Sequence, residues 1–192
     1  EATGVVTQVD EACVLLDMAA PCPSDVEAPV EVTLAVALLK GDKLSDVVRQ
    51  ATELGVSAVQ LLHTQRADVR TLSPAKETRL NRVAAEAAKQ CGRARVPEIR
   101  APIQVAAFAP EGLVLVGHPR AARFVGDVLD AWLDGEVAPV SFVTGPEGGF
   151  SEEEIADLAS RGAVPVRLGR RTLRAETAPL AFVAALLGRL DG

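Results

Sequence analysis

Apolar residues follow two alternating patterns from about residue 30 to the C-terminal end of this chain. Short runs that are apolar throughout are typical of strands buried on both faces of a parallel sheet. They alternate with longer stretches in which apolar residues recur every three or four positions, as in amphipathic helices. The short runs predict strands over residues 32–39, 58–62, 113–116, 140–143 and 164–168. This alternation predicts an α/β domain, a parallel sheet flanked by helices on both faces.

The predicted helices carry local signals for where they begin. Asp42 can cap the first helix, and Pro74 suits the first turn of the second. Ser151 and Glu154 have the spacing of a capping box, in which each side chain binds the backbone of the other residue. The helices are expected over residues 43–54, 74–91, 119–133, 152–161 and 177–190.

The N-terminal stretch, residues 1–29, differs from the rest of the chain. Two short apolar runs, residues 5–9 and 13–16, are separated by a polar turn and predict a pair of strands. Prolines then interrupt residues 20–24. We therefore expect the end of a small β domain and its linker in the N-terminal stretch, and the α/β domain in residues 30–192.

The composition is that of a globular protein and restricts the sites it can build. Apolar residues make up 48% of the chain, charged residues 24% and aromatic residues only 3%. Leu, Val and Ala must therefore fill the core, and stacking of bases on aromatic side chains is disfavoured. Three scattered cysteines, Cys13, Cys22 and Cys91, are too few for a disulfide framework or a zinc site. We expect reduced thiols, no metal and a cytoplasmic protein with no membrane helix.

Basic residues gather in two blocks of a chain whose net charge is −6. Residues 60–100 hold nine basic and four acidic side chains, and residues 161–192 hold six basic and two acidic ones. If the fold brings the two blocks together, they form one positive surface that attracts nucleic acid. The alternative is that both blocks are solvated helix faces, and the sequence alone leaves the two interpretations open.

Three predicted strands end in turns that could hold a ligand, at residues 117–119, 145–150 and 168–178. In an open parallel sheet, ligands bind beyond the carboxyl ends of the strands. None of the turns has the dinucleotide-binding, P-loop or hydrolase-elbow pattern of glycines. The turns therefore predict a ligand site that belongs to none of these common enzyme classes.

Charged side chains in these turns admit both a functional and a structural interpretation. Glu147 follows a strand end, where its burial is unfavourable unless it meets a donor. Arg170, Arg171 and Arg174 favour an anionic partner, although they would also fit a surface network of ion pairs. His118 is expected to face solvent or to cap a turn rather than to take part in catalysis.

Together the turns resemble the signature of a known family. Gly145-Pro-Glu-Gly-Gly-Phe and Leu168-Gly-Arg-Arg-Thr-Leu-Arg-Ala-Glu-Thr-Ala look like the two C-terminal motifs of the bacterial ribosomal RNA small-subunit methyltransferase E family. Supporting matches lie at residues 39–43, 52–55 and 86–93. The two C-terminal motifs are specific when they occur together, as they do in this sequence.

The resemblance covers about residues 30–190 and implies a fold and an activity. Family members belong to the SPOUT superfamily, in which the α/β domain carries a C-terminal trefoil knot. A PUA-like β-barrel precedes that domain, and residues 1–29 would be its last part. The resemblance also implies a homodimer that uses S-adenosyl-L-methionine to methylate N3 of a uridine in 16S ribosomal RNA of the small subunit.

The family motifs also imply roles for individual residues. The resemblance places the cofactor against Leu115, Gly117, Gly145, Glu147, Gly148, Gly149, Leu168, Arg171 and Leu173. Uracil N3 must lose its proton, and the candidates for stabilising the resulting anion are Arg93, Arg171 and Arg174. The residues expected to contact RNA are Arg66, Arg70 and Arg93. A valine at position 148 is expected to block the cofactor's approach and to leave the fold intact.

Two alternative functions stay open at the level of the sequence. A non-catalytic RNA-binding or ribosome-assembly module with the same fold would bind RNA without transferring a methyl group. A nucleotide-binding enzyme that does not act on RNA would bind the cofactor and would tolerate replacement of Arg66 and Arg93.

Overall fold

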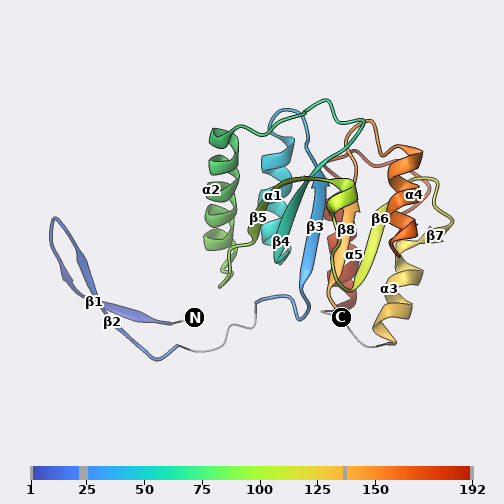
Figure 1. Cartoon of the computed structure of the whole chain (residues 1–192). Helices are drawn as coiled ribbons and strands as arrows, with labels where there is room; N and C mark the ends of the chain where they lie inside the picture. Colours follow the sequence, from blue (N-terminus) through green and yellow to red (C-terminus); the bar gives the residue numbers. More distant parts are fainter. Residues whose placement is uncertain (1, 22–25, 136–137, 191–192) are drawn as a thin grey trace.

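The computed structural model describes residues 2–21, 26–135 and 138–190, and its centre is a seven-stranded sheet (Figure 1). The strand order is β5-β4-β3-β8-β6-β9-β7, and neighbouring strands run parallel. The strands are β3 (Val32–Ala37), β4 (Ala58–His63), β5 (Glu98–Gln104), β6 (Leu113–Gly117), β7 (Arg123–Phe124), β8 (Val140–Thr144) and β9 (Val164–Arg167).

Helices cover both faces of this sheet. They are α1 (Lys43–Glu53), α2 (Pro74–Cys91), α3 (Val125–Leu133), α4 (Glu152–Ser160) and α5 (Ala178–Leu190), with a 3-10 turn, η1 (Val105–Ala107). The helices α1, α2, α3 and α5 share one large apolar core with the sheet. A second, smaller core contains residues of α4 and η1. The predicted architecture, a parallel sheet flanked by helices, is confirmed.

Three details differ from the sequence prediction. The apolar pattern does not reveal β5, because this edge strand is a mixture of exposed and half-buried residues with no fully buried one. The helix expected over residues 119–133 begins only at Val125, because residues 123–124 form the short edge strand β7 beside β9. Asp42 stands before α1 but makes no capping hydrogen bond, since its carboxylate pairs with Arg79 at 2.9 Å.

The N-terminal residues form a hairpin that stands apart from the main sheet (Figure 1). Its antiparallel strands, β1 (Gly4–Val9) and β2 (Val14–Met18), confirm the two predicted strands. Every residue of both strands is exposed to solvent. Residues 22–25, which include Cys22 and part of the predicted linker, lie outside the described residues. The domain boundary at residue 29 stays a prediction.

The capping box of α4 also holds the loop between β4 and α2. The Oγ of Ser151 accepts a hydrogen bond from the backbone N of Glu154 at 3.1 Å, and Glu154 Oε2 accepts one from the backbone N of Ser151 at 2.8 Å. Glu154 Oε1 accepts a further hydrogen bond from the backbone N of Gln65 at 2.8 Å. Because Glu154 is buried, this carboxylate fixes the β4–α2 loop against the start of α4.

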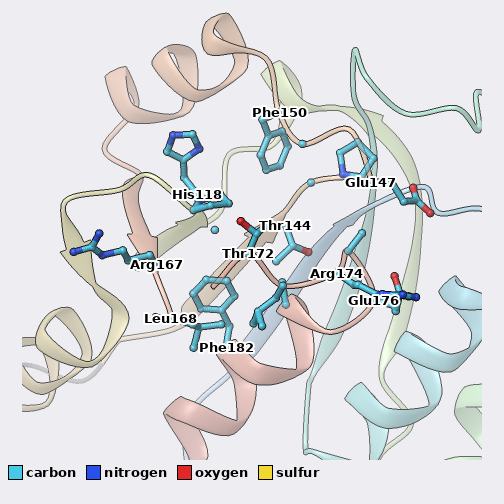
Figure 2. Close-up of a pocket in the computed structure, with 18 of the residues that line it drawn as sticks. His118, Thr144, Glu147, Phe150, Arg167, Leu168, Thr172, Arg174, Glu176 and Phe182 are labelled. Carbon is cyan, nitrogen blue, oxygen red and sulfur yellow. The ribbon is translucent and has the colours of Figure 1, made fainter. Parts of the chain in front are cut away.

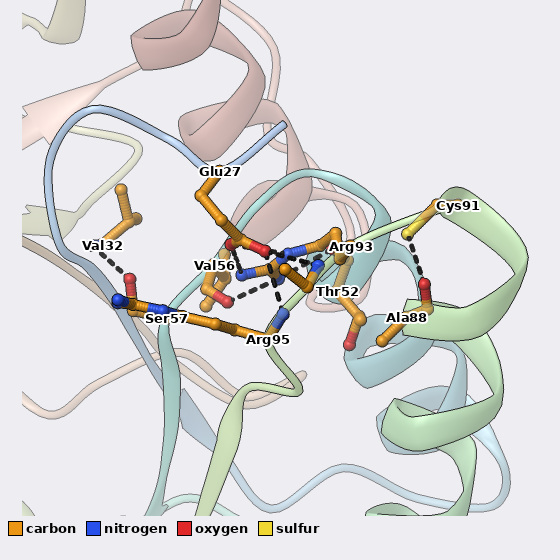
Figure 3. Close-up of polar contacts among 10 residues, drawn as sticks. Glu27, Val32, Thr52, Val56, Ser57, Ala88, Cys91, Arg93 and Arg95 are labelled. Carbon is orange, nitrogen blue, oxygen red and sulfur yellow. Dashed lines mark hydrogen bonds and ion pairs between the residues drawn. The ribbon is translucent and has the colours of Figure 1, made fainter. Parts of the chain in front are cut away.

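A buried ion pair joins the segment before β3 to the end of α2 (Figure 3). Arg93 donates from Nη2 to Glu27 Oε2 at 2.6 Å, and from Nη1 to the carbonyls of Thr52 and Val56 at 3.0 and 2.8 Å. The other oxygen of Glu27 accepts hydrogen bonds from the backbone N–H groups of the two residues after Arg93, each at 3.0 Å. The Arg93 side chain is only 4% exposed.

This network argues against the expectation that Arg93 acts in catalysis or contacts RNA. Its Nε and both Nη atoms already donate hydrogen bonds within the chain. Moving the side chain toward a substrate would leave the Glu27 carboxylate without its cationic partner, which is unfavourable at a half-buried site. Arg93 therefore has a structural role, which is to fasten the segment that leads into β3.

Replacing Glu154 with Gln should lower the free energy of unfolding by about 1–2 kcal/mol. The amide oxygen can accept from only one of the two backbone donors, and its NH2 group faces the other. Glu153→Gln is a matched control in the same turn, because Glu153 is exposed, and should change stability by less than about 0.5 kcal/mol. Chemical denaturation measures both changes. Unchanged hydrogen exchange at the Gln65 amide would show that other contacts hold the loop.

Replacing Glu27 with Gln should lower the free energy of unfolding by about 2 kcal/mol at neutral pH, because the buried Arg93 charge loses its counter-charge. Glu86→Gln is the control, since Glu86 pairs with Arg82 at 3.6 Å on the exposed surface and should contribute less than about 0.5 kcal/mol. Urea denaturation of the three proteins gives both values, and equal effects would argue against a structural role of the Glu27–Arg93 ion pair.

The contribution of Glu27 to the free energy of unfolding should also depend on pH. Burial opposes ionisation of this carboxyl, but hydrogen bonds and charge from Arg93, with two backbone N–H groups, outweigh burial and hold the pKa of Glu27 below 4.5. Stabilisation by such a group is fully present above its unfolded-state pKa and disappears as the pH falls through the folded-state value. The stability difference between wild type and Glu27→Gln should therefore shrink below pH 4.5. A constant difference down to about pH 3 would contradict this.

Candidate functional site

A cavity of about 550 Å³ opens at the carboxyl ends of β6, β8 and β9 (Figure 2). Residues 117–120, 144–150, 166–169 and 171–176, which end or follow these strands, form most of its wall. Neighbouring parallel strands bring their carboxyl ends to the same edge of a sheet. The three turns that the sequence analysis singled out therefore meet at one cavity, whose size is typical of small-molecule sites.

The inner part of the cavity combines apolar surfaces with one unpaired hydroxyl. Phe182 of α5 stacks on Phe142 of β8 with 5.7 Å between ring centroids. Figure 2 shows Leu168 next to Phe182 and Phe150 at the opposite side, with Thr144 between them. Thr144 Oγ1 is buried and has no hydrogen-bond partner among the described residues. A buried hydroxyl gains from a partner, so Thr144 marks a place where a polar group of a ligand fits.

Glycines in the cavity wall are required by the close approach of neighbouring groups. A Cβ atom on Gly117 would lie only 2.7 Å from Cε2 of Phe182. Gly149 has a φ angle of +69°, which L-residues with side chains rarely adopt. Gly117 thus leaves room for Phe182 beside the first loop, and Gly149 allows the turn of the second loop that leads into α4.

Gly148 lies against the β4–α2 loop, and this position bears on how a valine at 148 would affect cofactor binding. A Cβ atom on Gly148 would lie 3.1 Å from both the Cβ and the carbonyl O of Arg66. The added Cβ therefore presses on the β4–α2 loop. A valine at 148 would require a shift of the loop that carries Arg66, so its expected effect on cofactor binding would include this shift as well as the volume of the side chain.

A cluster of four charged side chains lies at the rim of the cavity beside α1, and we call it the Lys43 cluster. The Nζ atom of Lys43, the first residue of α1, lies 2.9 Å from Glu147 Oε1 and 3.4 Å from Glu176 Oε2. Arg174 Nη1 lies 3.8 Å from Glu176 Oε1. Lys43 is therefore the cationic partner of Glu147. The sequence pattern does not reveal this pair, because the two residues are 104 positions apart.

The Lys43 cluster keeps its central pair ionised. The hydrogen bond to Glu147 raises the pKa of Lys43 against the opposing effect of burial, and Glu176 adds to the shift. Burial alone would raise the pKa of Glu147, but the hydrogen bond and the charge of Lys43, with backbone hydrogen bonds, outweigh burial and lower it. Both side chains are therefore charged at neutral pH.

Exposed arginines from the two basic blocks meet at the mouth of the cavity. Arg66 belongs to the first block, and Arg171 and Arg174 belong to the second; all three line the cavity and are exposed. This arrangement favours the interpretation of the blocks as one positive surface. Arg70 lies outside the cavity lining and donates hydrogen bonds at 3.3 and 3.0 Å to two carbonyls of its own loop. Its role is to brace the loop that carries Arg66.

Most of the residues expected to bind the cofactor lie on the cavity wall. The eight that do so are Gly117, Gly145, Glu147, Gly148, Gly149, Leu168, Arg171 and Leu173. Leu115 does not line the cavity, because its side chain is 1% exposed and packs in the apolar core. His118 lines the cavity, and its backbone bonds to Val166 and Ala121 shape the turn. Three further residues line the cavity, Lys43, Thr144 and Phe182. The sequence pattern does not mark them as site residues, because they stand outside the glycine-bearing turns.

Two further observations concern residues 2–21, 26–135 and 138–190. No group of three or more His, Cys, Asp or Glu side chains in these ranges is placed to hold a metal ion. No helix of the same ranges is both long enough and apolar enough to cross a membrane. Cys13 and Cys91 are free thiols.

The cavity has the features needed to hold a flat ligand with polar edges. Leu168, Leu173 and Phe182 offer apolar surfaces to the faces of a ring. The Thr144 hydroxyl and the rim charges can bind polar and charged groups at its edges. The exposed arginines at the mouth can bind an anionic second reactant.

Comparison with known proteins connects this cavity to one family. A family model described as an RNA methyltransferase domain matches residues 26–187 of the chain. The ribosomal RNA small subunit methyltransferase E of Synechocystis is 40% identical over 172 aligned positions, covering 86% of this chain and 55% of that protein. The protein of the same name from Aquifex aeolicus is 32% identical over 169 positions, covering 83% of this chain and 69% of that protein. The chain thus spans little more than half the length of the Synechocystis relative.

A solved structure shares the fold. The crystal structure of a ribosomal RNA small subunit methyltransferase E from Neisseria gonorrhoeae bound to S-adenosyl methionine has a TM-score of 0.87 and 28% sequence identity, covering 98% of this chain and 78% of that chain. The family model covers most of the α/β domain, including the three loops around the cavity. The chain therefore belongs to the ribosomal RNA small subunit methyltransferase E family.

Proposed function

We propose that this chain binds S-adenosyl-L-methionine in the cavity and transfers its methyl group to N3 of a uridine in 16S ribosomal RNA of the small subunit. The observation that carries the proposal is the convergence of the loops after β6, β8 and β9 on one cavity, in a chain of this family. The family member from Neisseria gonorrhoeae was solved with S-adenosyl methionine bound. The sequence resemblance supplies the position of the methylated atom.

The residues of the cavity fit this cofactor. An adenine ring needs apolar contact on its faces, which Leu168, Leu173 and Phe182 can provide. It also needs polar partners at its edge, and the buried Thr144 hydroxyl is available for one of them. Gly117 lets the backbone come close, because any side chain there would collide with Phe182.

When bound, the cofactor supplies a methyl group on a sulfonium, which an electron-rich nitrogen can take in an in-line displacement. The residues of the chain then have to hold the uracil in line and to stabilise the negative charge that remains once the N3 proton has left. Arg171 and Arg174, exposed at the cavity mouth, are the proposed groups for this charge. Arg66 is proposed to contact an RNA phosphate, with Arg70 bracing its loop.

The proposal includes the knotted topology and the dimer that the resemblance implies. Helix α5 follows the third loop of the cavity, yet it contacts α1, α3, β3 and β8. The chain after β9 therefore returns to the middle of the sheet. This path supports the trefoil knot that the family resemblance implies, although knots are rare among protein folds in general. We place the homodimer in the cytoplasm, where its ribosomal substrate would be found.

The N-terminal hairpin supports the proposal of a PUA-like β-barrel. Apolar side chains of both strands, among them Val5, Val9 and Leu15, are at least half exposed. Many exposed apolar side chains on one small element are unfavourable in water unless another element covers them. We propose that β1 and β2 are strands of such a barrel, which would help to hold the RNA.

Replacing Arg174 with Met should lower the rate of methyl transfer about 100-fold while changing cofactor affinity less than about threefold, because the arginine acts on charge that develops during the reaction. Arg171→Met should also slow transfer. The matched control is Arg170→Met, since Arg170 is exposed in the same loop and does not line the cavity. The assay follows labelled methyl transfer to small ribosomal subunits from a strain without this activity, and mass spectrometry locates the methyl group.

Three results, from calorimetry, RNA binding and the methyl-transfer assay, would count against the proposal. Absence of cofactor binding in calorimetry by the folded protein would remove its basis. RNA binding without methyl transfer would favour the ribosome-assembly alternative. Equal loss of activity in Arg170→Met and Arg174→Met would show that the loop contributes only general positive charge.

A further inference from the structure

Lys43 connects three parts of the chain that are far apart in the sequence. It is the first residue of α1, while Glu147 follows β8 and Glu176 precedes α5. Its Nζ lies 2.9 Å from a Glu147 oxygen and 3.4 Å from a Glu176 oxygen. The side chains of all three residues are about one third exposed or less, at 36%, 28% and 24%. One ammonium group thus stands between the carboxylates of two loops that form opposite parts of the cavity wall.

We infer that Lys43 is a positioning residue, which sets the spacing of the 144–150 and 166–176 loops by bridging their carboxylates. The inference rests on the proposed function only where cofactor affinity is concerned. It assigns to Lys43 no contact with reacting atoms. Its action is on the shape of the site, through Glu147 and Glu176.

The physical reason lies in the repulsion between the two carboxylates. Glu147 and Glu176 share one half-buried rim, and an oxygen of each lies within 3.4 Å of the same ammonium group. Glu176 Oε2, the oxygen nearest Lys43, is buried and accepts no hydrogen bond from the described residues. Without Lys43 the two like charges would face each other in a partly desolvated place, where such pairs are strongly unfavourable. The loops would then move apart.

Neighbouring cations do not replace Lys43 in this position. Lys40 is committed to Asp68, with 2.7 Å between Nζ and the carboxylate, and its side chain is 60% exposed. Arg174 reaches only Glu176, at 3.8 Å, and its side chain is 84% exposed. Lys43 is thus the cation that contacts both carboxylates among the pairs found in the described residues. The Arg174 side chain is thus largely exposed at the mouth of the cavity, where the second reactant would arrive.

The test uses a substitution that removes the charge and a second one that removes the repulsion. Lys43→Met should weaken binding of S-adenosyl-L-methionine about tenfold, and Lys43→Arg should bind within about twofold of wild type. Adding Glu147→Gln to Lys43→Met removes one of the facing charges and should restore affinity to within about threefold of wild type. Lys40→Met is the control and should leave affinity unchanged within about twofold. Isothermal calorimetry measures all five proteins.

Rescue by a second substitution separates positioning from direct contact. If Lys43 bound the cofactor itself, Glu147→Gln would not compensate for its loss, and the double variant would bind as weakly as Lys43→Met or more weakly. That result, or wild-type affinity in Lys43→Met, would overturn the inference. A tenfold loss that the double variant reverses would support it.

Hydrogen exchange of the protein without cofactor provides a readout that does not depend on the proposed function. In Lys43→Met the amides of both loops should exchange faster than in wild type, and the double variant should slow them again. Amides in the middle of α2 serve as the internal reference. If wild type does not bind the cofactor, the proposed function fails while the exchange rates still decide the role of Lys43. Unchanged exchange in both loops would overturn that role.

Discussion

The pairing of β6 with both β8 and β9 is the constraint on which the rest of the molecule depends. All three strands run in the same direction, so the loops that follow them must meet at one edge of the sheet. The order also separates β8 from β9 by the width of one strand, which leaves room for a cavity between their loops. Helix α5 closes this space from one side by placing Phe182 against Phe142.

A second regularity is the separation of apolar and charged groups within the site. The chain has only five phenylalanines, and Phe142, Phe150 and Phe182 lie in or directly beneath the cavity. Charged groups occupy the rim and the mouth, where water screens them and a polymeric anion can reach them. In the proposed function, the aromatic side chains would face the small ligand, and the arginines would contact the RNA.

The sequence predicts those elements that a local pattern encodes. It does not predict a contact whose two residues lie far apart in the chain. The apolar runs show the central strands, because these are buried on both faces, while edge strand β5 has no such pattern. The capping box of Ser151 is visible from spacing alone, but its bond to Gln65 is not. The sequence marks Arg93 as a candidate functional arginine, whereas the structure pairs it with Glu27, which lies 66 positions away in the chain. Local motifs therefore predict which residues gather at one cavity, and long-range ion pairs decide which of its charges are already paired within the chain.

The unpaired hydroxyl of Thr144 has a consequence for ligand discrimination. A cavity with apolar walls selects by shape, and shape alone separates similar rings poorly. A ring of the right size that offers no polar atom to this hydroxyl would seal it away from water without a partner, which costs about 1–3 kcal/mol. That penalty corresponds to roughly a 5- to 150-fold loss of affinity. Thr144 can thus act as a filter that rejects flat apolar molecules from a pocket they would otherwise fit.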